Sequence, residues 1–287
     1  MSRSEGNPKT EKKLLENPFV GSLVVPIAIV LVGALIIFGV TTMLSTDRSY
    51  KDLVREMQSK TFGNRWIAAY ELSKLIATSS VPAEELPWLV TQLSSVYNES
   101  PDPRTREFLI VALGALKHPM VVPTLEKGLS DEAPLVRFHA LVSIGNLQAP
   151  SLVNWELVKP FLDAEDHGLR HAALLALAHH RVDGAEEILE RKLDDDVAGV
   201  RYAAALALIG YKNEKAVPQL TDILLNQGGV DTALDEEQLI QLQINILEHI
   251  EREQWKLLSG VLSEVLSLKA NPRLTTKTQE VLNLLKN

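Results

Sequence analysis

The chain has 287 residues, with 29 lysines and arginines, 37 aspartates and glutamates, and no cysteine. Its net charge of -8 argues against nucleic-acid phosphates as the main partner. The missing cysteines exclude disulfide frameworks, thiolate nucleophiles and cysteine-ligated metals. Only 5% of the residues are aromatic while 46% are hydrophobic, so aliphatic residues and alanine dominate, a balance that favours helices over sheets.

The first feature in chain order is a long uncharged segment. The 30 residues between Glu16 and Asp47 carry no charge, and about 20 apolar residues are enough for a helix to cross a bilayer. A cleaved signal peptide has a shorter apolar region that ends in a small-residue cleavage site, and a buried core helix is shorter too. We therefore expect residues 1–17 to form a short tail and residues 18–46 a single transmembrane helix.

The orientation of this span is less clearly marked. Four lysines and arginines lie near each end, so the positive-inside count is tied. A short tail with four positive charges crosses a membrane less readily than a large following domain, which favours an inside N-terminus. In a Gram-negative bacterium, this would make the protein a single-pass protein of the inner membrane, with its C-terminal domain in the periplasm.

After Asp47, apolar residues recur at spacings of three and four between prolines, glycines and asparagines, which predicts short amphipathic helices. Five arginines recur with them, 41, 31, 33 and 31 residues apart. They are Arg65, Arg106, Arg137, Arg170 and Arg201. The residues three and seven positions after each arginine are apolar, and the residue six positions after it is small in four of the five units. This period predicts repeated helical pairs that pack closely on one another.

The repeat divides the rest of the chain into three segments. Residues 47–63 are expected to form a connecting amphipathic helix, and residues 64–227 the repeated pairs. Residues 228–287 keep the helical period without the arginine, so we expect C-terminal capping helices there. The unit that starts at Arg137 is longer than its neighbours, so its second helix should fall out of register.

Two segments carry the pattern most clearly: Arg-Phe-His-Ala-Leu-Val-Ser-Ile-Gly-Asn-Leu from Arg137, and Val-Arg-Tyr-Ala-Ala-Ala-Leu-Ala-Leu from Val200. They resemble the HEAT repeat, and more closely its short variety first named from phycobilin lyases. The resemblance covers residues 65–227 and implies an armadillo-like α-solenoid. It also implies that the repeated arginines pair with acidic residues of the loops between units, and so are structural rather than a phosphate-binding row.

Histidines and acidic clusters are the residues that could bind a metal ion. The histidines are His167, His171, His179 and His180. No third ligand stands at a metal-binding spacing from them. The acidic clusters, residues 165–166 and 194–196, come directly before two first helices, where carboxylates cap a helix and complement its positive end. We therefore expect neither a metal ion nor a cofactor.

The candidate partner-binding residues lie on the second helices. Trp88 points away from the apolar stripe of its helix, so it is either an exposed contact for a partner or packed on the adjoining unit or the membrane-proximal helix. Trp155 and Trp255 are also expected on second helices, but the spacing does not show toward which side their side chains face. The full candidate set is Trp88, Trp155, Glu156, Glu187, Glu190 and Arg191.

No phosphate-binding loop, catalytic triad order or nucleophile elbow appears, and solenoids present shallow surfaces rather than deep pockets. We therefore expect a membrane-anchored, non-catalytic scaffold whose second helices line a concave surface for a membrane-associated protein partner. The alternative, implied by the resemblance to phycobilin lyases, is a lyase or chaperone-like protein that handles a tetrapyrrole or another cofactor. A nucleic-acid module is disfavoured because the second helices are mixed to acidic in charge.

Overall fold

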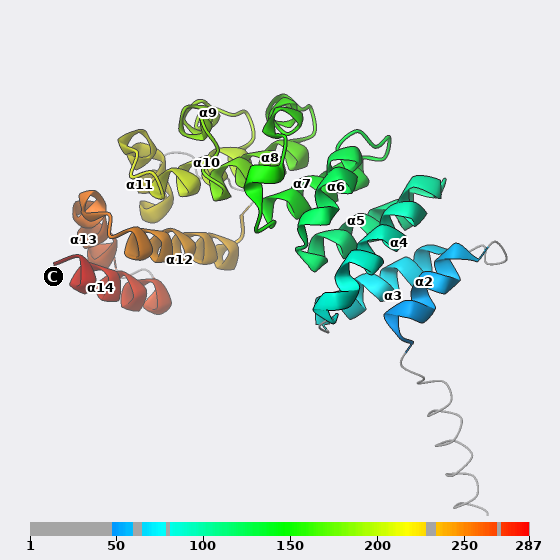
Figure 1. The fold of residues 1–287 in the computed structure, drawn as a ribbon. Coiled ribbons are helices and arrows are strands. Elements are labelled where there is room, and N and C mark those ends of the chain that lie inside the picture. The colour runs from blue at the N-terminus through cyan, green and yellow to red at the C-terminus, as the bar shows by residue number, and fades with distance from the viewer. Residues whose placement is uncertain (1–47, 60–64, 79–80, 228–233, 269–270, 287) are drawn as a thin grey trace, which may run out of the picture. The chain divides into compact units, whose positions relative to one another are not determined.

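The computed structural model describes residues 48–59, 65–78, 81–227, 234–268 and 271–286. The expected transmembrane segment, residues 18–46, lies outside the described residues. Within the described ranges, no helix combines the length and the hydropathy that crossing a bilayer requires. Residues 50–287 form one compact unit, and all its described regular elements are α-helices or 3₁₀ helices (Figure 1). The expected all-α solenoid is confirmed there.

One set of α-helices runs through the compact unit, and each member packs against the next in chain order (Figure 1). We call these the first helices. They are α3 (Arg65–Thr78), α5 (Pro103–Leu116), α7 (Pro134–Gly145), α8 (His167–His179), α10 (Ala198–Ile209), α12 (Glu236–Glu253) and α14 (Pro272–Lys286). Because α12 and α14 extend the same series, the alternation continues beyond the five arginine-bearing units.

A second set of helices packs beside the first and completes the pairs. These second helices are α4 (Leu86–Glu99), α6 (Val122–Gly128), α9 (Ala185–Lys192), α11 (Val217–Leu225) and α13 (Ser259–Leu268). Short 3₁₀ turns precede most of them: η3 (Ala83–Glu85), η4 (Pro119–Val121), η8 (Glu214–Ala216) and η9 (Lys256–Leu258). Three second helices carry a proline in the first turn, where the missing amide hydrogen costs no helical bond.

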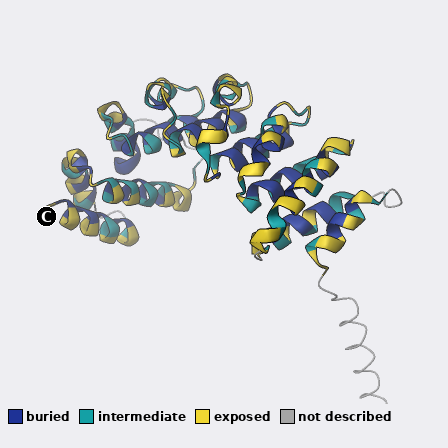
Figure 2. Cartoon of the chain, in the orientation of Figure 1, coloured by how far each residue is buried: buried dark blue, intermediate teal, exposed yellow. Residues whose placement is uncertain are grey.

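The repeated apolar positions form the core, as the sequence predicts. The residues three and seven positions after the arginines are buried in all five units: Ala68, Leu72, Leu109, Leu113, Ala140, Ile144, Ala173, Leu177, Ala204 and Leu208. Figure 2 shows buried segments continuing along the first helices. Small residues are required between them, because a Cβ atom on Gly114 of α5 would lie 2.2 Å from Ser143 Oγ of α7.

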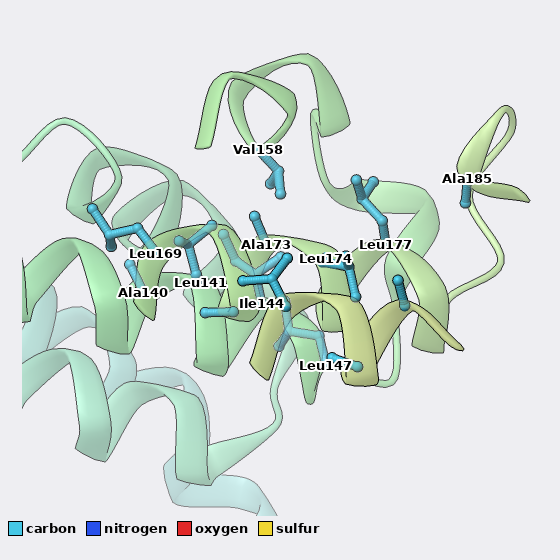
Figure 3. Packing of buried hydrophobic residues seen from close by; sticks show 14 of the residues in the cluster. Ala140, Leu141, Ile144, Leu147, Val158, Leu169, Ala173, Leu174, Leu177 and Ala185 are labelled. Atoms are coloured by element: carbon cyan, nitrogen blue, oxygen red, sulfur yellow. The ribbon is translucent and has the colours of Figure 1, made fainter. Parts of the chain in front are cut away.

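The unit that starts at Arg137 departs from the expectation of a displaced second helix. Three short 3₁₀ segments stand in its place: η5 (Pro150–Leu152), η6 (Trp155–Leu157) and η7 (Lys159–Asp163). Pro150 and Pro160 lack an amide hydrogen, which suits short 3₁₀ runs better than a continuous helix. Val158 is fully buried and points toward Ala173 and Leu174 of α8 (Figure 3), so the segment still covers its first-helix neighbour.

Two further details concern the beginning and the end of the unit. Helix α2 (Tyr50–Gln58) lies within the segment expected to connect span and solenoid, yet it buries Leu53, Val54 and Met57 against the core. It therefore acts as a packed element of the solenoid. Trp255, expected on a second helix, precedes η9 and is only 5% exposed.

Candidate functional site

The arginine of each repeat points into the turns between units. Arg106 Nε lies 2.7 Å from Asp131 Oδ2, and the two side chains are 16% and 5% exposed. Its Nη1 also donates to the carbonyl oxygens of Ser100 and Pro101, at 3.1 and 3.0 Å. The guanidinium group of Arg106 thus joins the turn before α5 to the turn after α6.

The other four arginines make related contacts. Arg170 Nη2 lies 2.9 Å from Asp195 Oδ1. Donation to main-chain carbonyls of the preceding turns occurs at 2.7 Å for Arg137, 2.8 Å for Arg201 and 3.4 Å for Arg65. These bonds direct the guanidinium groups toward the protein's own turns, and this geometry favours a structural role over phosphate binding.

Asp131 is held in its ionised form by its neighbours. It accepts hydrogen bonds from the Tyr97 hydroxyl and from the amide of Ala133, both at 2.9 Å, in addition to the ion pair with Arg106. Burial alone would raise the pKa of Asp131, but the bonds from Arg106 and Ala133 outweigh burial, so its pKa lies below the usual range.

The histidines and acidic clusters serve the fold in a similar way. His180 Nε2 lies 3.2 Å from the carbonyl oxygen of Ile144, and its ring centroid lies 5.4 Å from that of Trp155. Asp166 caps α8 by accepting from the amide of Gly168 at 2.7 Å. Across the described part of the chain, no group of three or more histidines, aspartates and glutamates is arranged to hold a metal ion.

The two tryptophans proposed to bind a partner lie in different units and different environments. Trp88, near the start of α4, is 41% exposed. Trp155 is half-buried at the start of η6, where its Nε1 donates to the carbonyl oxygen of Pro150 at 3.2 Å. Helices α5, α6 and α7 come between them along the chain, so the two side chains do not form one continuous site.

The four charged candidates are also divided. Glu190 accepts a hydrogen bond from Lys215 of the next unit, an interaction that lowers its pKa. Glu156 is exposed and pairs with the lysine three residues later. Glu187 and Arg191 are exposed on α9. Among these four charged residues, only Glu187, Glu190 and Arg191 share one helix, α9.

The structure reveals an open groove that the sequence analysis did not predict. It has a volume of about 440 Å³ and is lined by the first helices α7, α8 and α10, the turns that follow α8 and α10, and the end of α12. The expected receiving surface was on the second helices, but the groove lies on the first. Those helices approach one another closely because small residues separate them, among them Ala172, Ala176 and Ala207 in the groove wall.

The apolar part of the groove follows the arginine spacing. Val142, Leu175 and Leu206 each stand five positions after an arginine, and all three line the groove. Val142 is 38% exposed and Leu175 is 44% exposed. The same position in the first two units holds Tyr70, which is 41% exposed, and Val111, which is half-buried. We call these five residues the plus-five row.

The plus-five row is the signal that sequence reasoning overlooked. An apolar residue recurs there in all five units: Tyr70, Val111, Val142, Leu175 and Leu206. Since the residues three and seven positions after the arginine already form the core, a further apolar position between them makes the apolar stripe wider than one packed face requires. A repeated apolar position that stays at least partly accessible is typical of a surface that meets a partner.

The other end of the groove is polar. Arg181 and Arg252 line it together with Glu253, and the arginine side chains are 60% and 62% exposed. The Arg181 guanidinium lies 5.5 Å from the Tyr211 ring centroid. Tyr211 Oη is buried and, among the described residues, has no hydrogen-bond partner. The groove therefore combines an apolar wall with two accessible cations.

One histidine, His249, lies at this end beside Arg252. His249 Nδ1 lies 2.7 Å from Arg252 Nη2. Burial, followed by the charge of Arg252, lowers the pKa of His249 below its ordinary value. The neutral imidazole can thus accept from Arg252 and hold the guanidinium in place at the groove mouth.

Comparisons with known proteins agree with this architecture. A family model of HEAT repeats matches residues 86–155 and 156–233, together just over half of the chain. The X-ray structure of E. coli YibA is similar, with a TM-score of 0.55 and 18% identity over 81% of this chain and 82% of that one.

A second similar structure is a chain of the complex of CpcE and CpcF of phycocyanin lyase from Nostoc sp. PCC7120. Its TM-score is 0.55 at 17% identity, over 83% of this chain and 94% of that one. No curated protein matches the sequence. At these identities the two structural similarities show a shared fold.

Proposed function

This chain belongs to the HEAT-repeat family, and from that premise we propose that it is a membrane-anchored, non-catalytic scaffold that binds a protein segment along its first helices. The observation that carries the proposal is the plus-five row, an apolar position repeated in every arginine-bearing unit, exposed in three of them and half-buried in the other two. Three of its members form one wall of the groove. Burying such side chains contributes roughly 25 cal/mol per Å² of apolar surface.

The polar end of the groove indicates the chemistry of the segment. Two exposed arginines line this end, and the carboxylate of Glu253 lies 3.9 Å from Arg181 and 3.6 Å from Arg252, so one carboxylate is shared between two cations. A segment with apolar side chains and a carboxylate near one end would bury its apolar part on Val142 and Leu175. Its carboxylate would reach Arg181 or Arg252, and arginine forms strong, directional pairs with carboxylates.

The anchor proposed for residues 18–46 would give this binding a physical advantage. Tethering confines the solenoid near the bilayer and raises its effective concentration toward membrane-associated partners without any new contact. We place the C-terminal domain in the periplasm of a Gram-negative bacterium, on the charge argument made from the sequence. A single cysteine at Glu187, in a chain without natural cysteines, tests this side: a membrane-impermeant maleimide should label it in intact spheroplasts.

Site-specific photocrosslinking in native membranes tests the groove. A benzophenone amino acid replaces Leu175 in the groove or, as a matched control, Leu135, which is 58% exposed outside it. We expect a discrete protein adduct from position 175 that is absent from position 135, and stronger in the full chain than in residues 47–287. Equal adducts at both positions, or none at 175, would contradict the proposal.

The alternative, a protein that handles a tetrapyrrole or another cofactor, has one supporting observation. The groove volume of about 440 Å³ falls in the range of small-molecule sites, and cationic groups at its mouth suit carboxylate substituents. Titrating the protein with candidate tetrapyrroles tests it. A spectral shift that Arg252→Ala weakens would favour this function over the scaffold.

A further inference from the structure

The polar end of the groove lies where four first helices end. Helices α7, α8, α10 and α12 all contribute their last residues or the turn that follows them to the lining. Carbonyl groups at a helix C-terminus carry partial negative charge, which disfavours an anion. At each of these ends a carbonyl group already has a donor: the side chain of Asn146 for α7, the amide of Val182 for α8, Arg181 for α10 and the amide of Trp255 for α12. Because these carbonyl groups are paired, the charged side chains dominate the choice of ligand.

One positive charge of the polar end is unmatched. Among the described residues, the lysine, arginine, aspartate and glutamate side chains that line the groove are Arg181, Arg252 and Glu253. Arg181 Nη2 lies 2.8 Å from the carbonyl oxygen of Gly210, and Arg252 Nη2 lies 2.7 Å from His249 Nδ1. The Glu253 carboxylate lies farther from both guanidinium groups, at 3.9 and 3.6 Å. A close charge-assisted hydrogen bond is about 2.7–2.9 Å long, so Glu253 offsets charge without binding either arginine tightly.

The apolar wall and the arginines of the groove are close together. Leu206 lies four residues before Gly210, the C-cap of α10, which is about 6 Å along the helix axis. The carbonyl oxygen of Gly210 is the one that Arg181 binds. A ligand that uses both the wall and the arginine therefore presents an apolar side chain and a carboxylate within about 6 Å of each other. The last residue of a chain does so, because its side chain and its carboxylate leave the same Cα atom.

Further carboxylates lie around the polar end, outside the lining of the groove. Glu186 and Glu187 lie near Tyr211, whose pKa is raised by burial and raised further by their charges. At His249, burial lowers the pKa, and the charge of Glu248 acts in the opposite direction. These glutamates repel a segment that carries several carboxylates. A single carboxylate, in contrast, pairs with the one unmatched positive charge.

An aspartate or glutamate within a segment fits this arrangement less well than a chain end. In an extended segment, neighbouring side chains point to opposite faces, so an acidic residue and the apolar residue next to it do not reach the same wall. An acidic residue two positions further on reaches it, but its backbone then continues past the arginines, where Glu186, Glu187 and Glu248 surround the polar end. A C-terminus stops at the arginines and brings no further residue to these glutamates.

We propose that the groove captures the free C-terminus of its protein partner. The last side chain of the partner packs on Leu175 and Leu206, and the terminal carboxylate binds between Arg181 and Arg252. Glu253 holds the place of this carboxylate in the unbound protein, so a ligand without a carboxylate does not displace it. The inference rests on the proposed function and adds the chemistry of the segment, an apolar last residue with an unblocked carboxylate.

Three peptide libraries, captured on the immobilised full chain and identified by mass spectrometry, test this recognition. The first contains acetylated hexapeptides that end in all combinations of Ala, Val, Leu, Ile and Phe at the last three positions, with a free C-terminal carboxylate. The second contains the same sequences as C-terminal amides. The third extends each sequence by Gly-Asp-Gly-Gly amide, which places a carboxylate two residues after the last apolar side chain in a chain that continues. We expect the free acids to be enriched at least about 10-fold over both other libraries.

Three single substitutions show whether the polar end is responsible. Arg252→Gln changes an exposed side chain and should remove most of the enrichment of the free acids. Glu253→Gln removes the competing carboxylate and should strengthen the binding of the free acids roughly 3-fold, with no gain for the amides. Glu248→Gln is the matched control, because it removes the same charge from the same helix outside the groove. It should change the ratio of acid to amide binding far less than Glu253→Gln does.

The outcomes separate capture of a C-terminus from the proposed function. Equal enrichment of the acids and the amides, or of the acids and the aspartate peptides, overturns it, and so does the absence of enrichment in every library. Enrichment of the acids that Arg252→Gln leaves unchanged also overturns it, because the peptides then bind elsewhere. In each of these cases the scaffold stands if position 175 still yields its adduct in native membranes, since that crosslink does not depend on how the segment ends.

Discussion

The unit of α8 and α9 and the unit that begins with α7 build the same layer in different ways. The former pairs two α-helices, whereas the latter pairs α7 with three short 3₁₀ segments. Both first helices still bury the residues three and seven positions after their arginine. The comparison shows that the first helices form the continuous layer of the solenoid. The second element of a unit can be an α-helix or a set of 3₁₀ segments, provided that it supplies a buried apolar side chain.

The largest expected effect comes from the first-helix core. Leu177→Ala and Leu208→Ala each remove a fully buried side chain, so each should lower the free energy of unfolding by about 2–5 kcal/mol. Urea denaturation of residues 47–287 measures the loss. A change within the surface range of roughly 0.5 kcal/mol would show that the repeat positions are assigned wrongly.

A smaller loss of unfolding free energy is expected from the arginine–aspartate ion pairs that join successive units. Asp131→Asn removes the carboxylate charge that pairs with Arg106. Because Arg106 keeps its two carbonyl acceptors, we expect the free energy of unfolding to fall by about 2 kcal/mol. This is less than the loss expected when a buried charge is left with no partner. Exposed Asp196→Asn serves as the control, since Arg170 retains Asp195 there.

The same variant predicts a change in pH dependence. The pKa of Asp131 is lowered in the folded state, so its stabilisation is present above its unfolded pKa of about 3.9 and is lost as the pH falls through the folded value. The difference in unfolding free energy between native protein and Asp131→Asn should therefore shrink below about pH 4. A difference that is constant from pH 7 to acid would contradict the assignment.

The irregular unit should tolerate truncation better than the first helices do. Val158→Ala removes two methyl groups from a buried contact on α8, so we expect a loss of roughly 1–2 kcal/mol, less than for Leu177→Ala. If both variants lose the same free energy, the 3₁₀ segments contribute as much to the layer as a first helix does.

Most of the fold could be predicted because the repeat samples each position five times. Ala68, Leu109 and their equivalents are apolar in every unit, so periodicity identified the core without any other information. The 3₁₀ segments that replace the second helix of the Arg137 unit could not be predicted in this way. They occur once, and prolines such as Pro150 and Pro160 are compatible both with the start of a helix and with a 3₁₀ turn.

The groove was harder to predict for a different reason. Leu175 and Val142 are apolar like their buried neighbours, and spacing within one helix does not show whether another element covers an apolar position. Arg181, Tyr211 and Arg252 come from three separate segments of the chain. Their proximity follows from the packing of α8, α10 and α12, which no local pattern encodes.

The smallest expected effect on stability comes from a variant that compares an exposed with a buried leucine on the same helix. Leu175 and Leu177 lie two positions apart on α8, but Leu175 is 44% exposed and Leu177 is 1% exposed. Leu175→Ala should change the free energy of unfolding by less than about 0.5 kcal/mol, yet weaken capture of the groove's partner. Urea denaturation and crosslinking of the same variant measure the two effects. A stability loss near that of Leu177→Ala would mean that Leu175 belongs to the core and that the plus-five row is not a free surface.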